Sequence, residues 1–177
     1  RILLNHSNVE LTAVTSRRFD GLTVAEVFPA LSGLTSLKYQ NSTPQKIASV
    51  CDVVFLALPH GVSMDIAPHF VGAGKKVIDL SADYRLRDVK EYESWYVPHK
   101  SSNLLSEAVY GLPELYRKQI KKSVLVANPG CYPTSIILGL APALKDKFLE
   151  VSSIIANSAS GASGAGLAGA RFDPRKR

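Results

Sequence analysis

Four short apolar runs, separated by helical patterns, constrain the fold more than any other feature of this 177-residue sequence. The two middle runs are almost continuous Val, Ile, Leu and Phe, which is typical of strands buried on both faces of a parallel sheet. Strands that alternate with helices predict βαβ units, and therefore an α/β fold with a Rossmann-like, doubly wound parallel sheet. The four runs are 9–15, 52–58, 76–80 and 123–128.

Two segments between these runs carry helix signals. Thr43-Pro44 supplies an N-cap followed by a proline at the first helical position. Apolar residues recur every four positions over 62–70, where Pro68 is expected to kink the helix. Residues 86–122 are rich in Glu, Lys, Tyr and Ser, and we expect them to form an excursion on the surface.

The composition is that of a globular chain. Hydrophobic residues make up 46% of the sequence and charged residues 20%, which is enough apolar volume for a core. The longest apolar stretch, 136–144, is interrupted by Gly139 and Pro142 and is shorter than the roughly 18 residues of a membrane span. We therefore expect a soluble protein without a membrane partner.

The charge and the cysteines indicate the class of ligand and the compartment of the protein. The last seven residues carry half of the net charge of +6, and a basic tail is more often solvated than bound to nucleic acid. The mild positive excess elsewhere favours an anionic small molecule. Cys51 and Cys131 lie far apart and follow no secretory signal, which predicts free thiols in a reducing compartment, the cytoplasm.

Ligands of a doubly wound sheet bind at the carboxyl ends of its strands, so the residues after each run are the candidates for binding. Ser16, Arg17 and Arg18 follow the first run, where hydroxyl and guanidinium groups suit the 2′-phosphate of NADP. A solvated basic loop is the alternative. Arg85 follows the third run and is a candidate for binding a substrate anion, unless Asp83 simply neutralises it.

The second run ends abruptly at Leu58-Pro59-His60-Gly61, where His60 is expected to face the ligand. A lone histidine is more often structural than catalytic. No second His or Cys lies at metal-ligand spacing, so we expect no metal site.

The end of the sequence combines an alternating run with a loop of small residues. Residues 151–157 alternate in the manner of a strand. In the loop that follows, backbone N–H groups suit a phosphate, although the loop would equally serve as a hinge. Its candidate binding residues are Ser160, Gly161, Ser163 and Gly164.

The strongest signal is Asn128-Pro129-Gly130-Cys131, where a tight turn brings a cysteine from a strand end to the start of a helical pattern. Unpaired N–H groups and the helix dipole at that position favour the thiolate, which is a nucleophile, and the same groups are able to hold an oxyanion. We therefore predict that Cys131 is nucleophilic. Cys51 adjoins an apolar run and is expected to pack as a small hydrophobic residue.

Five motifs together resemble the N-acetyl-gamma-glutamyl-phosphate reductase family, which is related to aspartate-semialdehyde dehydrogenase. The resemblance implies NADPH-dependent reduction of N-acetyl-gamma-glutamyl phosphate to the 5-semialdehyde in arginine biosynthesis, with release of phosphate. It also implies a dinucleotide-binding domain over 1–130 and the beginning of a catalytic and dimerisation domain over 131–177, with a homo-oligomer at full length. The motifs are 58–63, 77–85, 110–114, 128–134 and 160–166.

The resemblance also implies roles for single residues. Cys131 would form a thioester with the substrate, and Arg85 and Asn128 would bind that substrate. NADP would contact Pro59, the basic loop after the first run and the loop of small residues. The general acid/base of the family is a histidine that neither His60 nor His99 matches.

Three departures from the family pattern stand out. The N-terminal glycine-rich loop and the C-terminal histidine motif are absent, and Gly166 is followed by Leu167 where the family usually has Arg. The sequence also opens without Met, on residues 1–6 that resemble the end of a helix. These features suggest a fragment that does not turn over substrate by itself.

Two other functions stay open on the residues alone. One is a Cys-His hydrolase that uses Cys131 with His60 or His99 and needs no nicotinamide. The other is a truncated, non-catalytic nucleotide-binding or interaction module.

Overall fold

The computed structural model describes residues 1–159 and 161, and the chain divides into two compact units, Arg1–Pro129 and Gly130–Arg177. Each unit is described by itself. Among the described residues, no helix is both long enough and apolar enough to cross a membrane.

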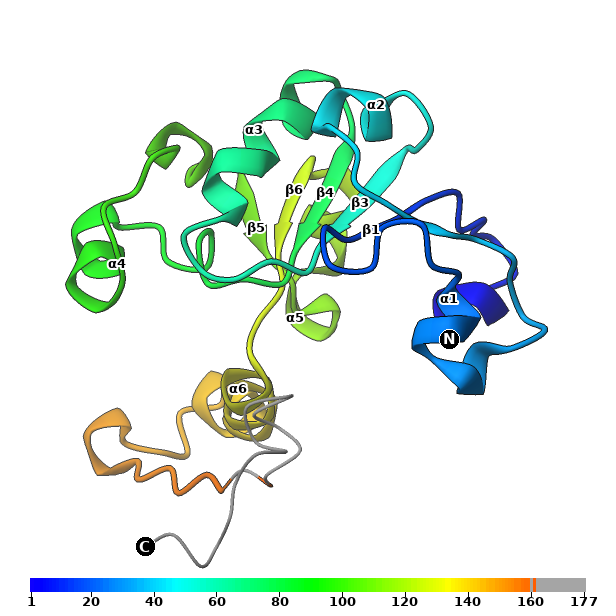
Figure 1. Ribbon diagram of the computed structural model, residues 1–177. Coiled ribbons are helices and arrows are strands. Elements are labelled where there is room, and N and C mark those ends of the chain that lie inside the picture. The colour runs from blue at the N-terminus through cyan, green and yellow to red at the C-terminus, as the bar shows by residue number, and fades with distance from the viewer. Residues whose placement is uncertain (160, 162–177) are drawn as a thin grey trace, which may run out of the picture. The chain divides into compact units, whose positions relative to one another are not determined.

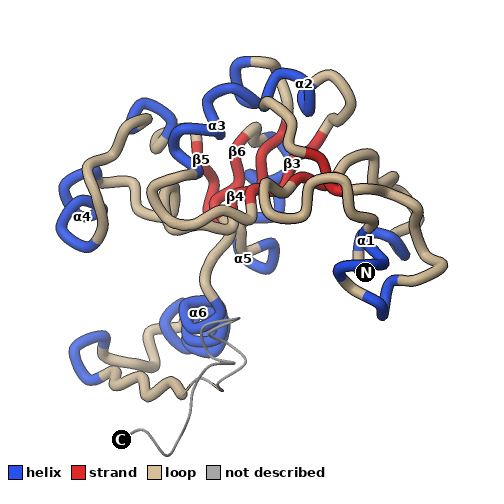
Figure 2. Tube along the Cα trace, viewed as in Figure 1, coloured by secondary structure: helices blue, strands red, loops and turns tan. Residues whose placement is uncertain are grey.

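The first unit is built on two parallel sheets (Figures 1 and 2). β1 pairs with β2, and the larger sheet has the order β3-β4-β6-β5. Every strand pair in both sheets is parallel, so the predicted α/β class with a parallel sheet is confirmed. The strands are β1 (Val14–Thr15), β2 (Tyr39–Gln40), β3 (Val53–Leu56), β4 (Lys76–Asp79), β5 (Ala108–Tyr110) and β6 (Leu125–Ala127).

The described part of the first unit also contains five α-helices and three short 3₁₀ turns. Helices α2 and α3 lie on one side of the larger sheet and α5 on the other (Figure 1). The helices are α1 (Val24–Val27), α2 (Pro44–Ala48), α3 (Ser63–Gly72), α4 (Val89–Trp95) and α5 (Pro113–Lys122). The 3₁₀ turns are Leu3–Asn5, Pro29–Leu31 and Ser102–Leu104.

The predicted start of α2 is confirmed. The Thr43 hydroxyl accepts a hydrogen bond from the Lys46 backbone N–H, and Pro44 occupies the first turn, where its missing N–H costs nothing. Helix α3 also forms over the predicted segment, with Pro68 inside it. The sequence therefore places both helices correctly.

The core of the first unit lies between the larger sheet and α3. Val77 on β4 and Leu125 on β6 are fully buried, and they belong to one cluster with Met64, Ala67 and Phe70 of α3. Burying a side chain of this size contributes roughly 1.5–3 kcal/mol. This packing fixes the positions of the strand ends.

The expectation of a surface excursion over 86–122 holds for most of the segment, which is exposed, but it is wrong for the residues that enter the core and the sheet. Tyr92 is fully buried, Leu112 is 1% exposed, and β5 forms an edge of the larger sheet. The buried side chains are scattered among polar neighbours, and β5 has only three residues, so the segment has no apolar run that a sequence pattern reveals.

The expectation that the second run is buried on both faces is also wrong. Val53 and Phe55 of β3 are 43% and 45% exposed, whereas Leu56 is buried. Strand β3 is an edge strand of the larger sheet, with β4 as its one strand partner among the described residues. The first run pairs only over Val14–Thr15, so most of that run lies outside the sheet.

The second unit contains α6 (Cys131–Lys145) and a 3₁₀ turn at Val151–Ser153. The strand expected over 151–157 is wrong, because a 3₁₀ turn and irregular backbone occupy that segment and Ile155 is 93% exposed. Alternation of apolar and polar residues predicts a strand only where a neighbouring strand accepts its hydrogen bonds. The described part of this unit has none.

Candidate active site

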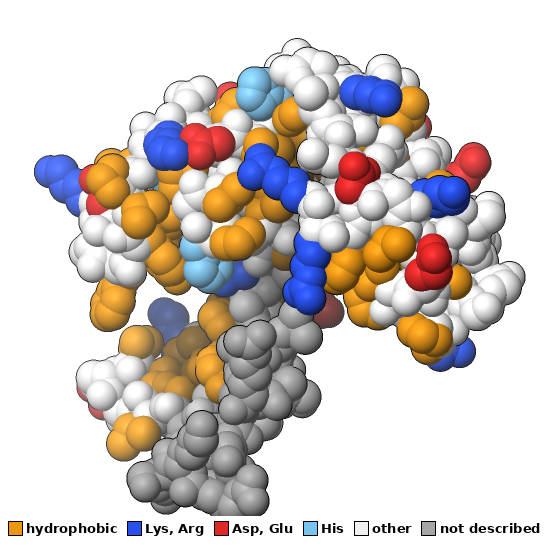
Figure 3. All heavy atoms as spheres, in the orientation of Figure 1, with side chains coloured by type: hydrophobic (Ala, Val, Ile, Leu, Met, Phe, Trp, Pro, Cys, Tyr) orange, Lys and Arg blue, Asp and Glu red, His pale blue; other side chains and the backbone are white. Residues whose placement is uncertain are grey.

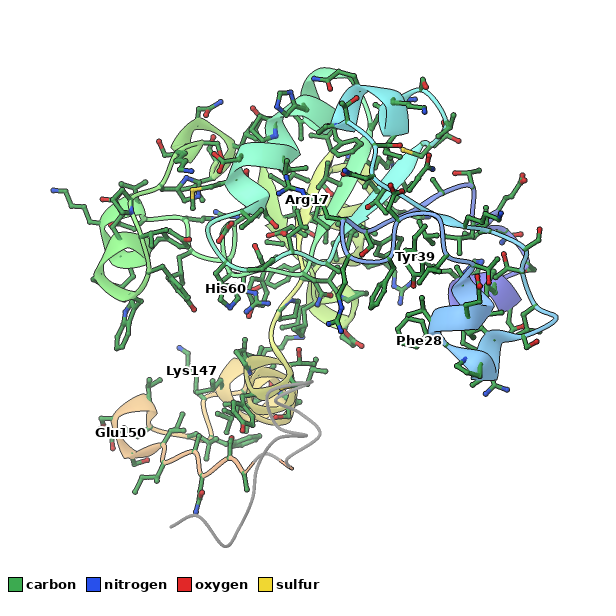
Figure 4. The ribbon with its side chains drawn as sticks, in the orientation of Figure 1. Arg17, Phe28, Tyr39, His60, Lys147 and Glu150 are labelled. Atoms are coloured by element: carbon green, nitrogen blue, oxygen red, sulfur yellow. The ribbon has the colours of Figure 1, made fainter. Side chains whose placement is uncertain are left out.

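The carboxyl ends of β3, β4 and β6 meet at one edge of the larger sheet, because the three strands are parallel and adjacent. The polar residues that follow these strands therefore lie close together. Figure 4 labels His60, in the loop after β3, and Arg17, in the loop after β1.

Asp83 is the centre of this edge. Its carboxylate is fully buried and accepts hydrogen bonds from the Gly61 backbone N–H at 2.9 and 3.0 Å. It also accepts from the Met64 backbone N–H at 3.2 Å and from the Tyr92 hydroxyl at 2.9 Å. The carboxylate thus pairs N–H groups at the start of α3, where the positive end of the helix dipole stabilises it.

Arg85 holds the ends of two strands together. Its Nε donates to the Asn128 carbonyl at 2.7 Å, and one Nη donates to the Leu80 carbonyl at 2.9 Å. The Asp83 carboxylate bonds to other groups, so the alternative that Asp83 neutralises Arg85 finds no support in the contacts. Arg85 instead fixes the carbonyl of Asn128, which lies between the end of β6 and Pro129.

Asn128 is held from three directions. Its backbone N–H donates to the Asp79 carbonyl at 2.8 Å, its carbonyl accepts from Arg85, and its side-chain amide donates to the Pro129 carbonyl at 3.0 Å. Gly111 packs against the same place, since a Cβ there would lie 3.1 Å from the Asn128 Cα. A larger residue than glycine would displace this strand end.

The two histidines of this edge differ in their surroundings. The Nδ1 atom of His60 accepts from the Ala82 backbone N–H at 2.9 Å, and the ring is exposed. The Nδ1 atom of His99 accepts from the Ser101 backbone N–H, so its Nε2 carries the proton and donates to the Asp83 carbonyl at 2.8 Å. Both ring nitrogens of His99 are therefore occupied by structural hydrogen bonds.

Two tyrosines complete the network. Burial raises the pKa of Tyr84 to about 12, and its hydroxyl lies 2.7 Å from the Ser101 hydroxyl. Burial also raises the pKa of Tyr92, and the adjacent Asp83 carboxylate raises it further. Both side chains stay neutral at physiological pH, and Tyr92 is a hydrogen-bond donor to Asp83.

The predicted basic loop follows β1 as expected. The Ser16 hydroxyl accepts from the Phe19 backbone N–H at 3.2 Å, and Arg17 is exposed. Arg18 is also exposed and lies over the Phe19 ring at 5.1 Å. Ser16 and Arg17 line a cavity of about 1030 Å³ that also reaches Leu58 at the end of β3.

Cys131 is the first residue of α6, so the predicted helix N-terminus is confirmed. Its side chain is exposed, and Gly130 is the N-cap, with an extended conformation. Cys51 is half-buried against the core, where burial raises the pKa of its thiol. The two thiols thus occupy contrasting surroundings.

For the other predicted site residues, the structure gives only their exposure or does not describe them. Pro59 is exposed in the loop after β3, and Gly161 is exposed. Ser160, Ser163 and Gly164 lie outside the described residues. Among residues 1–159 and 161, no group of three or more His, Cys, Asp and Glu side chains is placed to hold a metal ion.

Sequence patterns do not reveal Tyr92 or Gly111 at this edge, and of the two alternatives they left open for Arg85, neutralisation by Asp83 is not supported by the contacts. A single tyrosine in a polar segment carries no signal by itself. Gly111 belongs to the motif 110–114, but its close approach to the neighbouring strand is visible only in three dimensions.

Comparison with known proteins assigns the family. The profile described as "Semialdehyde dehydrogenase, NAD binding domain" matches residues 1–123, and "Semialdehyde dehydrogenase, dimerisation domain" matches residues 131–172. The chain belongs to the semialdehyde dehydrogenase family. The predicted relationship to that family is confirmed.

Curated relatives of this chain are named N-acetyl-gamma-glutamyl-phosphate reductase. The protein of Desulfotalea psychrophila is 55% identical over 166 residues, which is 94% of this chain and 48% of the relative. That of Geobacter sulfurreducens is 51% identical over 173 residues, 98% of this chain and 50% of the relative. The chain thus spans about half the length of the curated relatives it matches.

Solved structures support the fold of this semialdehyde dehydrogenase family member. Aspartate semialdehyde dehydrogenase with NADP from Candida albicans superposes with a TM-score of 0.59 at 19% identity, covering 82% of this chain and 42% of that one. Aspartate semialdehyde dehydrogenase II complexed with ASA from Vibrio cholerae gives a TM-score of 0.52 at 15% identity, covering 77% and 38%.

Proposed function

We propose that this chain belongs to an NADP-dependent reductase that converts N-acetyl-gamma-glutamyl phosphate into the 5-semialdehyde and releases phosphate, a step of arginine biosynthesis. The observation that carries the proposal is the position of Cys131, exposed at the first residue of α6 and three residues after Asn128. The names of the curated relatives support the substrate. We assign 1–130 to dinucleotide binding and 131–177 to the beginning of the catalytic domain.

Cys131 acts as the nucleophile in this proposal. Its thiolate sulfur attacks the acyl carbonyl carbon, the bond from that carbon to the phosphate oxygen breaks, and inorganic phosphate leaves with the electron pair. A thioester remains on Cys131. Backbone N–H groups in the first turn of α6, which have no partner within the helix, suit the oxyanion that forms during the attack.

Arg85 and Asn128 bind the substrate in this proposal. A guanidinium has five N–H donors, and Arg85 uses two of them on backbone carbonyls. The other three suit a phosphate or carboxylate oxygen. Because the two backbone bonds hold the guanidinium in place, its remaining donors keep a fixed direction.

The basic loop fits the cofactor NADP. Ser16, Arg17 and Arg18 follow β1, and a hydroxyl with two exposed guanidinium groups suits a 2′-phosphate. We assign Pro59 and the loop of Ser160, Gly161, Ser163 and Gly164 to the same cofactor. When bound, NADPH supplies the hydride that reduces the thioester to the aldehyde.

The surface charge agrees with a small anionic ligand. Lys and Arg side chains are spread over the visible face of the first unit (Figure 3), whereas nucleic-acid binding proteins gather them into a patch or stripe. The dimerisation-domain match supports a homo-oligomer. Two free cysteines agree with a reducing compartment, which we take to be the cytoplasm.

A Cys-His hydrolase fits these contacts less well. His99 would have to give up two hydrogen bonds before it accepted a proton from a thiol. His60 keeps its Nδ1 bonded to Ala82. Neither ring is arranged as a base oriented by a carboxylate, the arrangement that such hydrolases use.

Acylation of the thiol tests the proposed function directly. We expect stoichiometric phosphate release when the chain meets N-acetyl-gamma-glutamyl phosphate, with one acyl group on the Cys131 peptide by mass spectrometry. Cys131→Ser should abolish both signals, whereas Cys51→Ser, the matched control, should keep both. Phosphate release that persists in Cys131→Ser would refute the nucleophile. Absence of acylation in the unsubstituted chain would favour a non-catalytic module.

A further inference from the structure

Tyr110, the last residue of β5, lies at the same strand-end edge as Arg85 and Asn128. Strand β5 is parallel to β6 (Figure 1), and Tyr110 lies opposite Ala127, the residue before Asn128. The Gly111 N–H donates to the Ala127 carbonyl at 2.8 Å, which fixes the backbone directly after Tyr110. Tyr110 is therefore one strand away from the chain end that Arg85 holds.

The ring of Tyr110 is held in place, whereas its hydroxyl is unused. The ring is half-buried and contacts the Tyr116 ring edge-to-face, with 6.5 Å between the centroids. In the described part of the chain, no group forms a hydrogen bond with the Tyr110 hydroxyl. The hydroxyls of Tyr84 and Tyr92, at the same edge, both bond to neighbouring side chains. Tyr110 differs from them in offering a donor to a ligand.

The charge of the Arg85 guanidinium acts on this hydroxyl. Burial raises the pKa of Tyr110, and the positive charge of Arg85 offsets part of that rise. The hydroxyl stays protonated at neutral pH and remains a hydrogen-bond donor. Arg85 itself has five N–H donors, of which two bond to backbone carbonyls. A neutral O–H donor near a guanidinium with free donors suits an anionic oxygen.

The proposed substrate carries two anionic groups, a phosphate and a carboxylate. Asn128, whose carbonyl bonds to Arg85, precedes Cys131 by three residues, so the chain itself keeps their Cα atoms within about 11 Å. The phosphate is attached to the carbon that the thiol attacks, whereas three carbon atoms separate the carboxylate from that carbon. A phosphate also has three terminal oxygens, which accept from several donors at once. The phosphate is therefore the better match.

We propose that Tyr110 is a substrate-binding residue whose hydroxyl donates a hydrogen bond to a phosphate oxygen of the acyl phosphate, beside the Arg85 guanidinium. This inference rests on the proposed function and adds a donor to its site. When the bond from the acyl carbon to the phosphate oxygen breaks, phosphate leaves with the electron pair. The Tyr110 hydroxyl keeps its proton and stabilises the charge on the leaving group through the hydrogen bond.

The proposed phosphate site is separate from the proposed cofactor site. Ser16 and Arg17 line the cavity of about 1030 Å³, and neither Tyr110 nor Arg85 is among its lining residues. A probe that reports on Arg85 therefore distinguishes this site from an anion bound at the basic loop.

A titration with inorganic phosphate, followed through the NMR signal of the Arg85 Nε–H, tests the proposal. We expect Tyr110→Phe, which keeps the ring, to raise the dissociation constant of phosphate at least tenfold, because a hydrogen bond to a charged acceptor is lost. Tyr116→Phe is the matched control, since it removes the hydroxyl of the other ring in the pair, and should change the constant less than twofold. Equal binding by Tyr110→Phe, an equal loss in Tyr116→Phe, or no phosphate-dependent shift in the unsubstituted chain would overturn the proposal.

A second titration separates the phosphate from the carboxylate. N-acetylglutamate has the carboxylate of the proposed substrate but no phosphate. We expect its effect on the Arg85 signal to be the same in Tyr110→Phe and in the unsubstituted chain. A tenfold weaker binding of N-acetylglutamate to the variant would mean that the hydroxyl binds the carboxylate, and would overturn the assignment to phosphate.

Acylation of Cys131 distinguishes this inference from the proposed function. At limiting acyl phosphate, Tyr110→Phe should be acylated at least tenfold more slowly than the unsubstituted chain. Equal rates in both proteins would refute the role of Tyr110 and leave the proposed function standing. If neither protein is acylated, the proposed function fails, and the phosphate titration still decides whether Tyr110 binds phosphate.

Two measurements exclude a purely structural role for the hydroxyl. The urea midpoint of Tyr110→Phe should equal that of the unsubstituted chain, because the lost hydroxyl has no partner in the described residues. In the unsubstituted chain, phosphate should shift the ring signals of Tyr110 and leave those of Tyr92, whose hydroxyl is already bonded to Asp83, almost unchanged. Tyr110 signals that do not respond to phosphate would contradict the proposal even if the variant failed to fold.

Discussion

The buried carboxylate of Asp83 gives the sharpest stability prediction. It pairs the Gly61 and Met64 backbone N–H groups and the Tyr92 hydroxyl. Asp83→Ala leaves these three donors without their acceptor. Met64 N–H and the Tyr92 hydroxyl are buried, and each unsatisfied buried donor costs about 1–3 kcal/mol. Gly61 is half-buried and regains water, so the expected loss of unfolding free energy is about 2–6 kcal/mol.

Two milder substitutions should destabilise the chain less than Asp83→Ala. Asp83→Asn keeps one acceptor oxygen but turns an NH₂ group toward an N–H donor, so we expect a loss of about 1.5–3 kcal/mol. Tyr92→Phe removes one donor and leaves the carboxylate with the other two, for about 0.5–1.5 kcal/mol. The predicted order of destabilisation is Asp83→Ala, then Asp83→Asn, then Tyr92→Phe.

Urea unfolding followed by circular dichroism measures these losses. Asp20→Asn is the matched control, because Asp20 is exposed and accepts a single hydrogen bond, from the Asn41 backbone N–H. Its expected effect is within about 0.5 kcal/mol. If Asp83→Asn were as stable as the unsubstituted chain, or if Asp20→Asn cost as much, the assignment of Asp83 as the centre of the strand-end network would be wrong.

Three further predictions concern the thiols, the cofactor and pH. Iodoacetamide at neutral pH should label exposed Cys131 before half-buried Cys51, and peptide mapping that finds the reverse order would contradict the assignment. Arg17→Ala should weaken NADPH binding about tenfold or more and leave NADH binding unchanged, as measured by fluorescence titration; an equal loss for both would exclude a 2′-phosphate contact. The folded-state pKa of about 12 for Tyr84 exceeds the value near 10 of an unfolded chain, so its contribution is complete below pH 10 and is lost as pH rises toward 12. Between pH 9 and pH 11.5, the unfolding free energy measured in urea should fall by roughly 2 kcal/mol less in Tyr84→Phe than in the unsubstituted chain. An equal fall in both proteins would refute the shift.

Local sequence patterns were enough to predict the parallel α/β class, the capped start of α2 and the helix that begins at Cys131. In each case the signal is local: an apolar run, a Thr-Pro pair, or a Pro-Gly turn before a helical stripe. Such signals work because backbone preferences and capping act over a few residues, whatever the rest of the chain does.

Tertiary structure decided the partners of the charged residues and the fate of the weaker segments. Asp83 bonds to α3 and Tyr92 rather than to Arg85, two positions away, because its carboxylate is buried beside unpaired helix N–H groups. The segment 151–157 alternates like a strand but has no neighbouring strand among the described residues, and the scattered apolar residues of 86–122 find a core to enter. Burial and pairing depend on groups brought together from distant parts of the chain, so no local pattern of residues contains them.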